Sequence, residues 1–229
     1  MRKIAVAWML AAAANAQWHD HQVRQLNGQS QLLRFEAQTQ DLGEKWGRSL
    51  QWPYVIHMPE KDELLMLVLS ERPTRALLSR SKDHGATWTA PVYMHHDSNG
   101  KPDAPGATAL SYLGAGKATL VPLEGQKDWN WFSEDFGHSW KQIPRPPASP
   151  GKPFIVWDPF YVDAGARPGS LPRLVETGYV SIGKWEEGGY SQGVIRFSTD
   201  GGQTWSASTM VPQWRHRNEV SVTRAKNGT

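Results

Sequence analysis

Cysteine is absent from this chain of 229 residues, which excludes disulfides, thiolate metal ligands and thiol catalysis. Helical periodicity is also missing, because no stretch repeats apolar residues at intervals of three and four over the length of a helix. Lys and Arg form no run, and the formal net charge is only +3. Charge therefore gives no argument for nucleic acid or anionic membranes as partners.

Several motifs of known chemistry are also lacking. The chain contains no Gly-rich phosphate loop, no Ser nucleophile elbow and no H-E-x-x-H zinc motif. The adjacent His95 and His96 lack a matching carboxylate spacing for a metal site. We therefore expect no cofactor and no bound metal.

The first residues have the pattern of an export signal. Arg2 and Lys3 precede a short apolar stretch at 4–14, and small residues end at Ala16. The apolar stretch is too short to span a bilayer well. We expect residues 1–16 to be a cleaved signal peptide, with an uncleaved N-terminal anchor as the alternative. The protein is then secreted or periplasmic, with no transmembrane segment after removal of the leader.

What the chain does contain is one short motif in three copies. The pattern S-x-D-x-G-x-[ST]-W occurs at 81–88, 133–140 and 198–205. Copies roughly 50 to 65 residues apart indicate a stacked or radial repeat architecture. In each copy the Asp can accept backbone N–H bonds, and the Gly supplies a positive φ. Each copy therefore predicts a hairpin turn between two strands, which the Trp ring can cover.

Apolar stretches on both sides of these turns predict four strands per repeat. The expected strands are 52–57, 62–70, 75–80 and 87–94 in the first repeat, 107–113, 117–123, 128–133 and 140–143 in the second, and 154–162, 174–182, 193–197 and 205–211 in the third. Four strands per repeat without helices is typical of propeller blades.

The remaining segments frame these repeats. Residues 17–47 are polar and Gln-rich, with one expected strand at 31–37. A fourth repeat is expected to begin with a strand at 218–224. We therefore expect the sequence to end within a fourth, incomplete blade. We predict an all-β protein in which 48–229 is an incomplete propeller of about three and a half blades.

The repeated motif resembles the Asp boxes, or BNR repeats, of the sialidase (neuraminidase) superfamily. The resemblance covers about residues 50–229 and implies a six-bladed β-propeller of sialidase type. It also implies that the Asp boxes lie on the face away from the active site. Under that rule Asp83, Asp135 and Asp200 are structural, and Asp boxes indicate the fold better than the function.

Two further segments are similar to catalytic motifs of the family. The sequence from Arg217 to Val222 resembles the N-E-x-S-V segment, which implies that Glu219 activates a tyrosine nucleophile. That tyrosine would lie outside this chain. The sequence from Leu69 to Arg72 resembles the A-E-x-R segment, which implies that Arg72 binds substrate. Two structural alternatives remain open: an ion pair of Glu219 with a nearby arginine, and one of Arg72 with Glu71.

Two expected family features are missing. In sialidases the first strand opens with an R-I-P motif, whose arginine binds the carboxylate of the sugar. Here Gln51 replaces that arginine and is followed by Trp52 and Pro53. Gln cannot supply the charge or the bidentate geometry of that arginine. The loop after Arg72 also lacks the aspartate acid of the family.

Other residues expected on the same face are candidates for substrate binding. Arg48 or Arg75 is a candidate for the missing arginine, and Asp97 or Asp103 for the missing acid. Asp158 and Trp185 complete the set, the latter as a surface for stacking on a sugar ring or, alternatively, as part of the core.

The sequence thus predicts an exported sialidase-like glycoside hydrolase that acts on terminal sugars of extracellular glycans. The alternative is a non-catalytic Asp-box propeller that binds glycan or protein. The missing arginine and acid favour the alternative, and the segment around Glu219 favours the enzyme.

Overall fold

The computed structural model describes residues 18–26, 32–123, 128–145, 154–163 and 171–224. The expected signal peptide, 1–16, lies outside the described residues. The chain divides into two compact units, Met1–Arg48 and Ser49–Thr229. Among the described residues, no helix has the length and apolar character needed to cross a membrane.

The N-terminal unit is a hairpin followed by a short helix. Strands β1 (Trp18–Leu26) and β2 (Leu32–Gln40) pair antiparallel. Asp41 is the N-cap of helix α1 (Leu42–Trp46), and its carboxylate accepts the Glu44 N–H at 2.9 Å. It ends at Gly47, whose φ of 60° gives the left-handed cap. The sequence predicted one strand here and missed both β1 and the helix.

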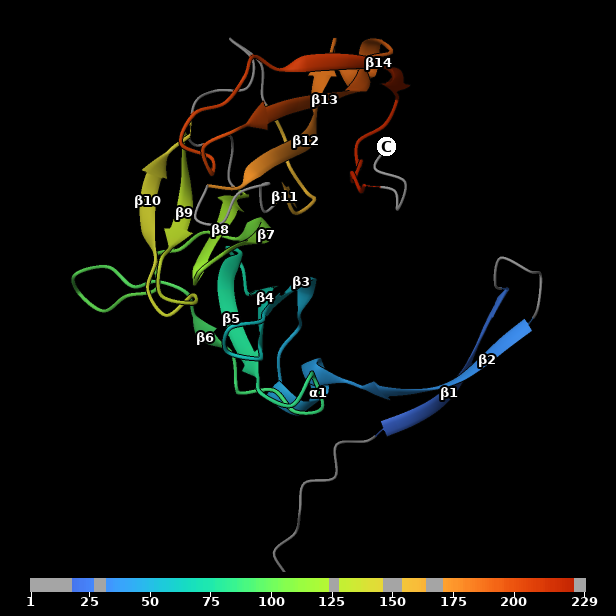
Figure 1. Cartoon of the computed structure of the whole chain (residues 1–229), viewed down its shortest axis with the longest axis vertical. Coiled ribbons are helices and arrows are strands. Elements are labelled where there is room, and N and C mark those ends of the chain that lie inside the picture. Colours follow the sequence, from blue (N-terminus) through green and yellow to red (C-terminus); the bar gives the residue numbers. More distant parts are fainter. Residues whose placement is uncertain (1–17, 27–31, 124–127, 146–153, 164–170, 225–229) are drawn as a thin grey trace, which may run out of the picture. The chain divides into compact units, whose positions relative to one another are not determined.

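The second unit is all-β and consists of three four-stranded antiparallel sheets that resemble propeller blades (Figure 1). Blade 1 contains β3 (Gln51–Met58), β4 (Glu63–Ser70), β5 (Arg75–Ser81) and β6 (Val92–Tyr93). Blade 2 contains β7 (Ala107–Gly114), β8 (Lys117–Pro122), β9 (Trp129–Ser133) and β10 (Lys141–Pro144). Blade 3 contains β11 (Tyr161–Asp163), β12 (Arg173–Ile182), β13 (Tyr190–Ser198) and β14 (Thr209–Arg215), with a 3₁₀ turn η1 (Trp185–Glu187) before β13.

The all-β class and the four strands per repeat are confirmed, with differences at the first and fourth strands. The strand expected at 87–94 is reduced to β6, and the one at 205–211 is shifted to β14. The stretch 154–162 pairs only through β11 and an isolated bridge between Ile155 and Tyr179. The strand expected at 218–224 is wrong, because these residues form no ladder.

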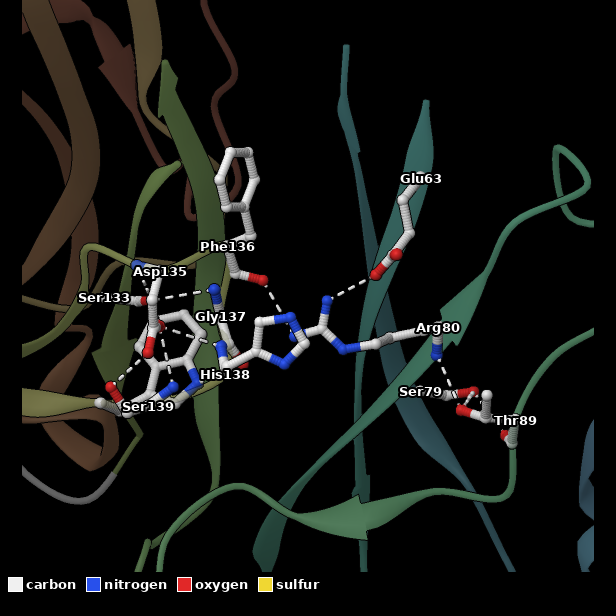
Figure 2. A network of polar contacts seen from close by, with 11 residues as sticks. Glu63, Ser79, Arg80, Thr89, Ser133, Asp135, Phe136, Gly137, His138 and Ser139 are labelled. Atoms are coloured by element: carbon white, nitrogen blue, oxygen red, sulfur yellow. Dashed lines mark hydrogen bonds and ion pairs between the residues drawn. The ribbon is translucent and has the colours of Figure 1, made fainter. Parts of the chain in front are cut away.

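Each repeated motif is the turn between the third and fourth strands of a blade, as predicted. In blade 2, Ser133 Oγ donates to Asp135 at 2.8 Å and accepts the Gly137 N–H at 2.8 Å. Asp135 also accepts the Ser139 N–H at 2.9 Å and its hydroxyl at 2.6 Å (Figure 2). The turns at Asp83 and Asp200 repeat this pattern of bonds. The three aspartates are thus committed to the turns.

Two apolar clusters and several polar contacts join neighbouring blades. One cluster combines blade 1 residues such as Leu67 with blade 2 residues such as Leu120, and a second joins blade 2 to blade 3 around Phe154 and Val180. Arg80 of β5 donates to Glu63 at 2.6 Å and to the Phe136 carbonyl of the blade 2 turn at 2.9 Å (Figure 2). The Asp135 turn thus also serves as a contact point between blades 1 and 2.

Candidate functional site

The first strand of blade 1 is irregular near its start. Between Gln51 and Tyr54 the pairing with β4 shifts by one residue, which is a β-bulge. Trp52 lies in this bulge with a φ of 48°, a value that a bulky side chain rarely adopts. Its side chain is 44% exposed. Bulges of this kind redirect side chains and are common beside active sites.

The corresponding segment of blade 3 carries Trp157 and Asp158. Backbone bonds of 2.9 Å in both directions between Ile155 and Tyr179 fix its start. Thr108 of blade 2 donates its hydroxyl to the Val156 carbonyl at 2.8 Å. The segment is therefore held by its own blade and by blade 2. Its Trp157 ring meets the Trp52 ring edge-to-face, with 5.1 Å between centroids.

Glu219 belongs to the segment that lacks the expected strand. The hydroxyl of Thr177 in β12 donates to the Val220 carbonyl, and Ser221 Oγ donates to Asp158 Oδ1 at 2.7 Å. These two bonds hold the residues that follow Glu219 beside β12 and Asp158. The Glu219 side chain itself is exposed. In place of a ladder, side-chain bonds therefore position this glutamate.

Tyr54 is the residue on which both carboxylates act. Burial raises the pKa of its hydroxyl to about 12, and the negative charges of Asp158 and Glu219 add to the rise, whereas the Ala109 backbone amide opposes it. The phenol is thus protonated at neutral pH and can donate a hydrogen bond. Tyr54 thus lies within the electrostatic influence of both Asp158 and Glu219.

The structure brings together Glu219 and Asp158 from the predicted set. The suggested ion pair of Glu219 with Arg215 or Arg217 does not form among the described side chains. Arg215 instead lies over the Tyr190 ring at 4.3 Å. No contact within the described residues joins Arg72 to this group.

The remaining predicted residues of blades 1 and 2 form a separate set of contacts. Arg72 is exposed in the β4–β5 turn. The alternative pairing of Arg72 with Glu71 does not form, and Tyr93 donates to Glu71. Arg75 opens β5 and bridges to Pro105.

Asp103 lies in the loop between blades 1 and 2, where its Oδ1 is 2.7 Å from Nδ1 of His95. The His95 ring packs against buried Trp131, with 4.8 Å between centroids. Asp97, the other candidate acid, accepts the Asn99 and Lys101 backbone N–H groups and so stabilises its own loop. Asp103 therefore remains the acid candidate of this loop.

Arg48 and Trp185 are the last two residues of the predicted set. Arg48 is the last residue of the N-terminal unit, and its N–H bonds the Gly43 carbonyl at 3.0 Å in the cap of α1. Trp185 belongs to η1 and is 61% exposed. Its alternative assignment to the core is therefore wrong.

Sequence reasoning gave no role in the site to two of its residues, Trp52 and Tyr54. Both belong to the strand that was predicted at 52–57, and Trp52 occupies the middle of the altered R-I-P motif. That alteration was the available signal, since an aromatic residue in the position after Gln51 changes the chemistry of the motif. Within the described part of the chain, no group of three metal-ligating side chains is present.

The comparisons with known proteins agree with the fold and leave the activity open. No family model matches the chain, and no curated protein matches it either. A solved protein of unknown function from Dyadobacter fermentans DSM 18053 superposes with a TM-score of 0.50 at 16% identity, over 70% of this chain and 54% of that chain.

Two further structures are more distant. The intramolecular trans-sialidase from Ruminococcus gnavus, in complex with oseltamivir carboxylate, has a TM-score of 0.36 at 18% identity, over 87% of this chain and 36% of that chain. YCF48 bound to D1 peptide has a TM-score of 0.28 at 15% identity, over 73% of each chain. This chain thus spans about half of the first structure and about a third of the second.

Proposed function

We propose that this protein is an exported sialidase-like glycoside hydrolase that acts on terminal sugars of extracellular glycans. The observation that carries the proposal is the hydrogen bond of 2.7 Å from Ser221 Oγ to Asp158 Oδ1, which holds the segment of one carboxylate, Glu219, beside a second, Asp158. They belong to segments far apart in the sequence, whereas the conspicuous Asp turns are occupied by structural bonds. Sialidases use a tyrosine nucleophile in place of the usual pair of carboxylates, so Glu219 has the role of activating that tyrosine.

The surroundings of each group suggest a role. Asp158 accepts a hydrogen bond from Ser221 at 2.7 Å, which fixes the orientation of its carboxylate. Glu219 is exposed and can exchange protons with substrate or water. Tyr54, protonated at neutral pH, acts as a donor that orients a sugar oxygen or a carboxylate. Arg72 and Arg75 add positive charge at the β4–β5 turn for the substrate.

The test is hydrolysis by the full-length protein of aryl sialosides and a panel of other aryl glycosides. We expect turnover of at least one of them, and a loss of kcat of about 100-fold or more in Glu219→Gln and in Asp158→Asn. Tyr54→Phe should lose about tenfold with the same pH profile from pH 5 to 9, because its phenol does not titrate in that range.

The matched control is Glu134→Gln, which removes an exposed carboxylate that pairs with Lys141 beside the Asp135 turn. It should retain full activity. Turnover of no substrate, or turnover that Glu219→Gln and Asp158→Asn leave intact, contradicts the proposal.

A second candidate function is a non-catalytic propeller that binds glycan or protein. Gln51 in place of an arginine favours it, as does the missing aspartate acid in the loop after Arg72. Glycan binding without hydrolysis, undiminished in Glu219→Gln, would support this second function over the first.

A further inference from the structure

Trp52 combines exposure with an unfavourable backbone conformation. Its side chain is 44% exposed, although large aromatic residues are usually well buried. Its φ of 48° is a genuine outlier for a bulky residue, and the surrounding structure must impose it. A glycine would adopt this φ without strain. The indole is thus held at the surface at a conformational cost, and packing of the core does not explain it.

The indole has a fixed partner across the blades. Trp157 of the blade 3 segment meets it with 5.1 Å between centroids and an interplanar angle of 73°. This is the edge-to-face geometry that aromatic pairs favour. Trp157 also lines a cavity of about 210 Å³ together with Pro122, Arg145 and Phe154. The two rings therefore form one aromatic surface that continues into a recess between blades 2 and 3.

Polar groups surround this aromatic surface. Asp158 follows Trp157 directly in the chain, and its carboxylate accepts a bond from Ser221. Tyr54, two residues after Trp52, lies where both Asp158 and Glu219 act on it. A flat apolar surface bordered by hydrogen-bonding groups suits a sugar ring. The polarised C–H bonds of such a ring meet the negative indole face, while its hydroxyls meet the carboxylates.

We propose that Trp52, held by Trp157, is a stacking platform for a sugar ring of the glycan ligand. The inference rests on the proposed function in one respect, since it names a substrate contact of that same site. The protein then selects its glycan by the apolar face of a sugar ring. An arginine in place of Gln51 would instead select a sugar that carries a carboxylate. The strained bulge of β3 has the role of presenting the indole.

The test separates binding from hydrolysis by working in the Glu219→Gln background. The probes are immobilised oligosaccharides with neutral and with sialylated termini, and the affinity of each variant is measured for the glycan that Glu219→Gln binds best. We expect Trp52→Ala to weaken binding about tenfold, as the loss of a stacking ring does elsewhere. Trp52→Phe should restore most of the affinity, because a phenyl ring also stacks.

The matched control is Phe197→Ala, which removes another exposed ring, 47% accessible, from β13 next to the Asp200 turn. It should bind like the parent. Oxidation of Trp52 by N-bromosuccinimide, followed by peptide mass spectrometry, should slow when the bound glycan is present. If Trp52 bound a protein side chain instead of a sugar, no oligosaccharide would protect it from oxidation. This result would overturn the proposal.

A second variant separates a binding role from a structural one. Trp52→Gly removes the ring and relieves the positive φ, so its melting temperature should equal or exceed that of the parent while its affinity falls as in Trp52→Ala. A lower melting temperature with unchanged affinity would assign Trp52 to packing and overturn the platform. Absence of turnover in the parent enzyme would contradict the hydrolase alone, because the binding results do not depend on it.

Discussion

At the scale of single residues, Asp135 shows how one carboxylate can stabilise a turn. Burial raises the pKa of Asp135, but the bonds from Ser139, Ser133 and His138 outweigh burial and lower the pKa to about 2. The pKa of Asp83 is likewise lowered to about 2, chiefly by the Thr87 hydroxyl and N–H. These carboxylates are thus bound as anions by their own turns, which explains their recurrence without any catalytic role.

A stability prediction follows for Asp135→Ala. The variant leaves the backbone N–H groups of His138 and Ser139 without their acceptor, so unfolding should require about 1–2 kcal/mol less, as for loss of a helix cap. Because the folded pKa lies below the ordinary value of 3.8, this stabilisation is complete above about pH 4 and declines as the pH falls toward 2. Denaturant unfolding of both proteins from pH 7 to pH 2 measures it. A constant difference across this range would contradict the role of the charge.

At the scale of strands and turns, local sequence patterns predicted most of the blades. The apolar stretch of β4 and the Ser–Asp–Gly–Trp turns depend on residues within one hairpin, so the sequence contains the whole signal. The fourth strands were less predictable from the sequence. The hydrogen bonds of each turn include residues that were expected to belong to the fourth strand, so the strand itself begins later. In blade 1, for example, the Thr89 N–H pairs with the Arg80 carbonyl before β6 begins.

The candidate site was only partly predictable for a different physical reason. Asp158 and Glu219 were among the expected residues, but the bond from Ser221 to Asp158 that joins their segments depends on tertiary packing. The bulge at Trp52 is a shift in pairing register beside Pro53, which cannot donate a ladder hydrogen bond, so the sequence marks the irregularity but not the direction of the indole. Local rules thus located the carboxylates, and only the tertiary structure supplied the tyrosine and the indole.

Gly178 of β12 allows the segment that begins at Phe154 to lie close to β12. A Cβ at this position would lie 2.3 Å from the Ile155 carbonyl oxygen and 2.8 Å from the Phe154 ring. Gly178→Ala must therefore displace the segment that leads to Trp157 and Asp158. We expect about 1–3 kcal/mol of destabilisation and a parallel loss of glycan binding.

Thermal unfolding and glycan affinity of Gly178→Ala measure these two effects together. The control is Ser181→Ala on the same strand, which adds no atoms and should change neither quantity. An alanine variant with parental stability and affinity would contradict the close approach of β12 to the site segment.

At the scale of the whole second unit, hydrogen bonds from arginine side chains join each blade to the next. Arg80 connects blade 1 to the turn of blade 2 through the Phe136 carbonyl (Figure 2). Between blades 2 and 3, Arg145 follows β10 and donates to Glu176 of β12 at 2.5 Å. Arg196 of β13 donates to the other oxygen of the same carboxylate. One buried glutamate thus joins three strands of two blades.

The charges at this junction are finely balanced. Burial lowers the pKa of the Arg196 guanidinium, and the nearby Arg145 lowers it further, whereas the charge of Glu176 opposes both. Arg196 also lies over the Phe154 and Trp205 rings, at 5.6 and 4.6 Å from their centroids. Glu176 is fully buried, so its charge is not replaced by solvent when it is removed.

We therefore predict that Glu176→Gln destabilises the protein by about 3–5 kcal/mol, since two buried guanidinium groups then face each other without a counter-charge. Arg145→Met should cost less, because Glu176 keeps its contact with Arg196. Denaturant unfolding of the two variants measures the difference. If Arg145→Met were as damaging as Glu176→Gln, attachment of the end of β10 would matter more than charge balance, and the junction would act through packing alone.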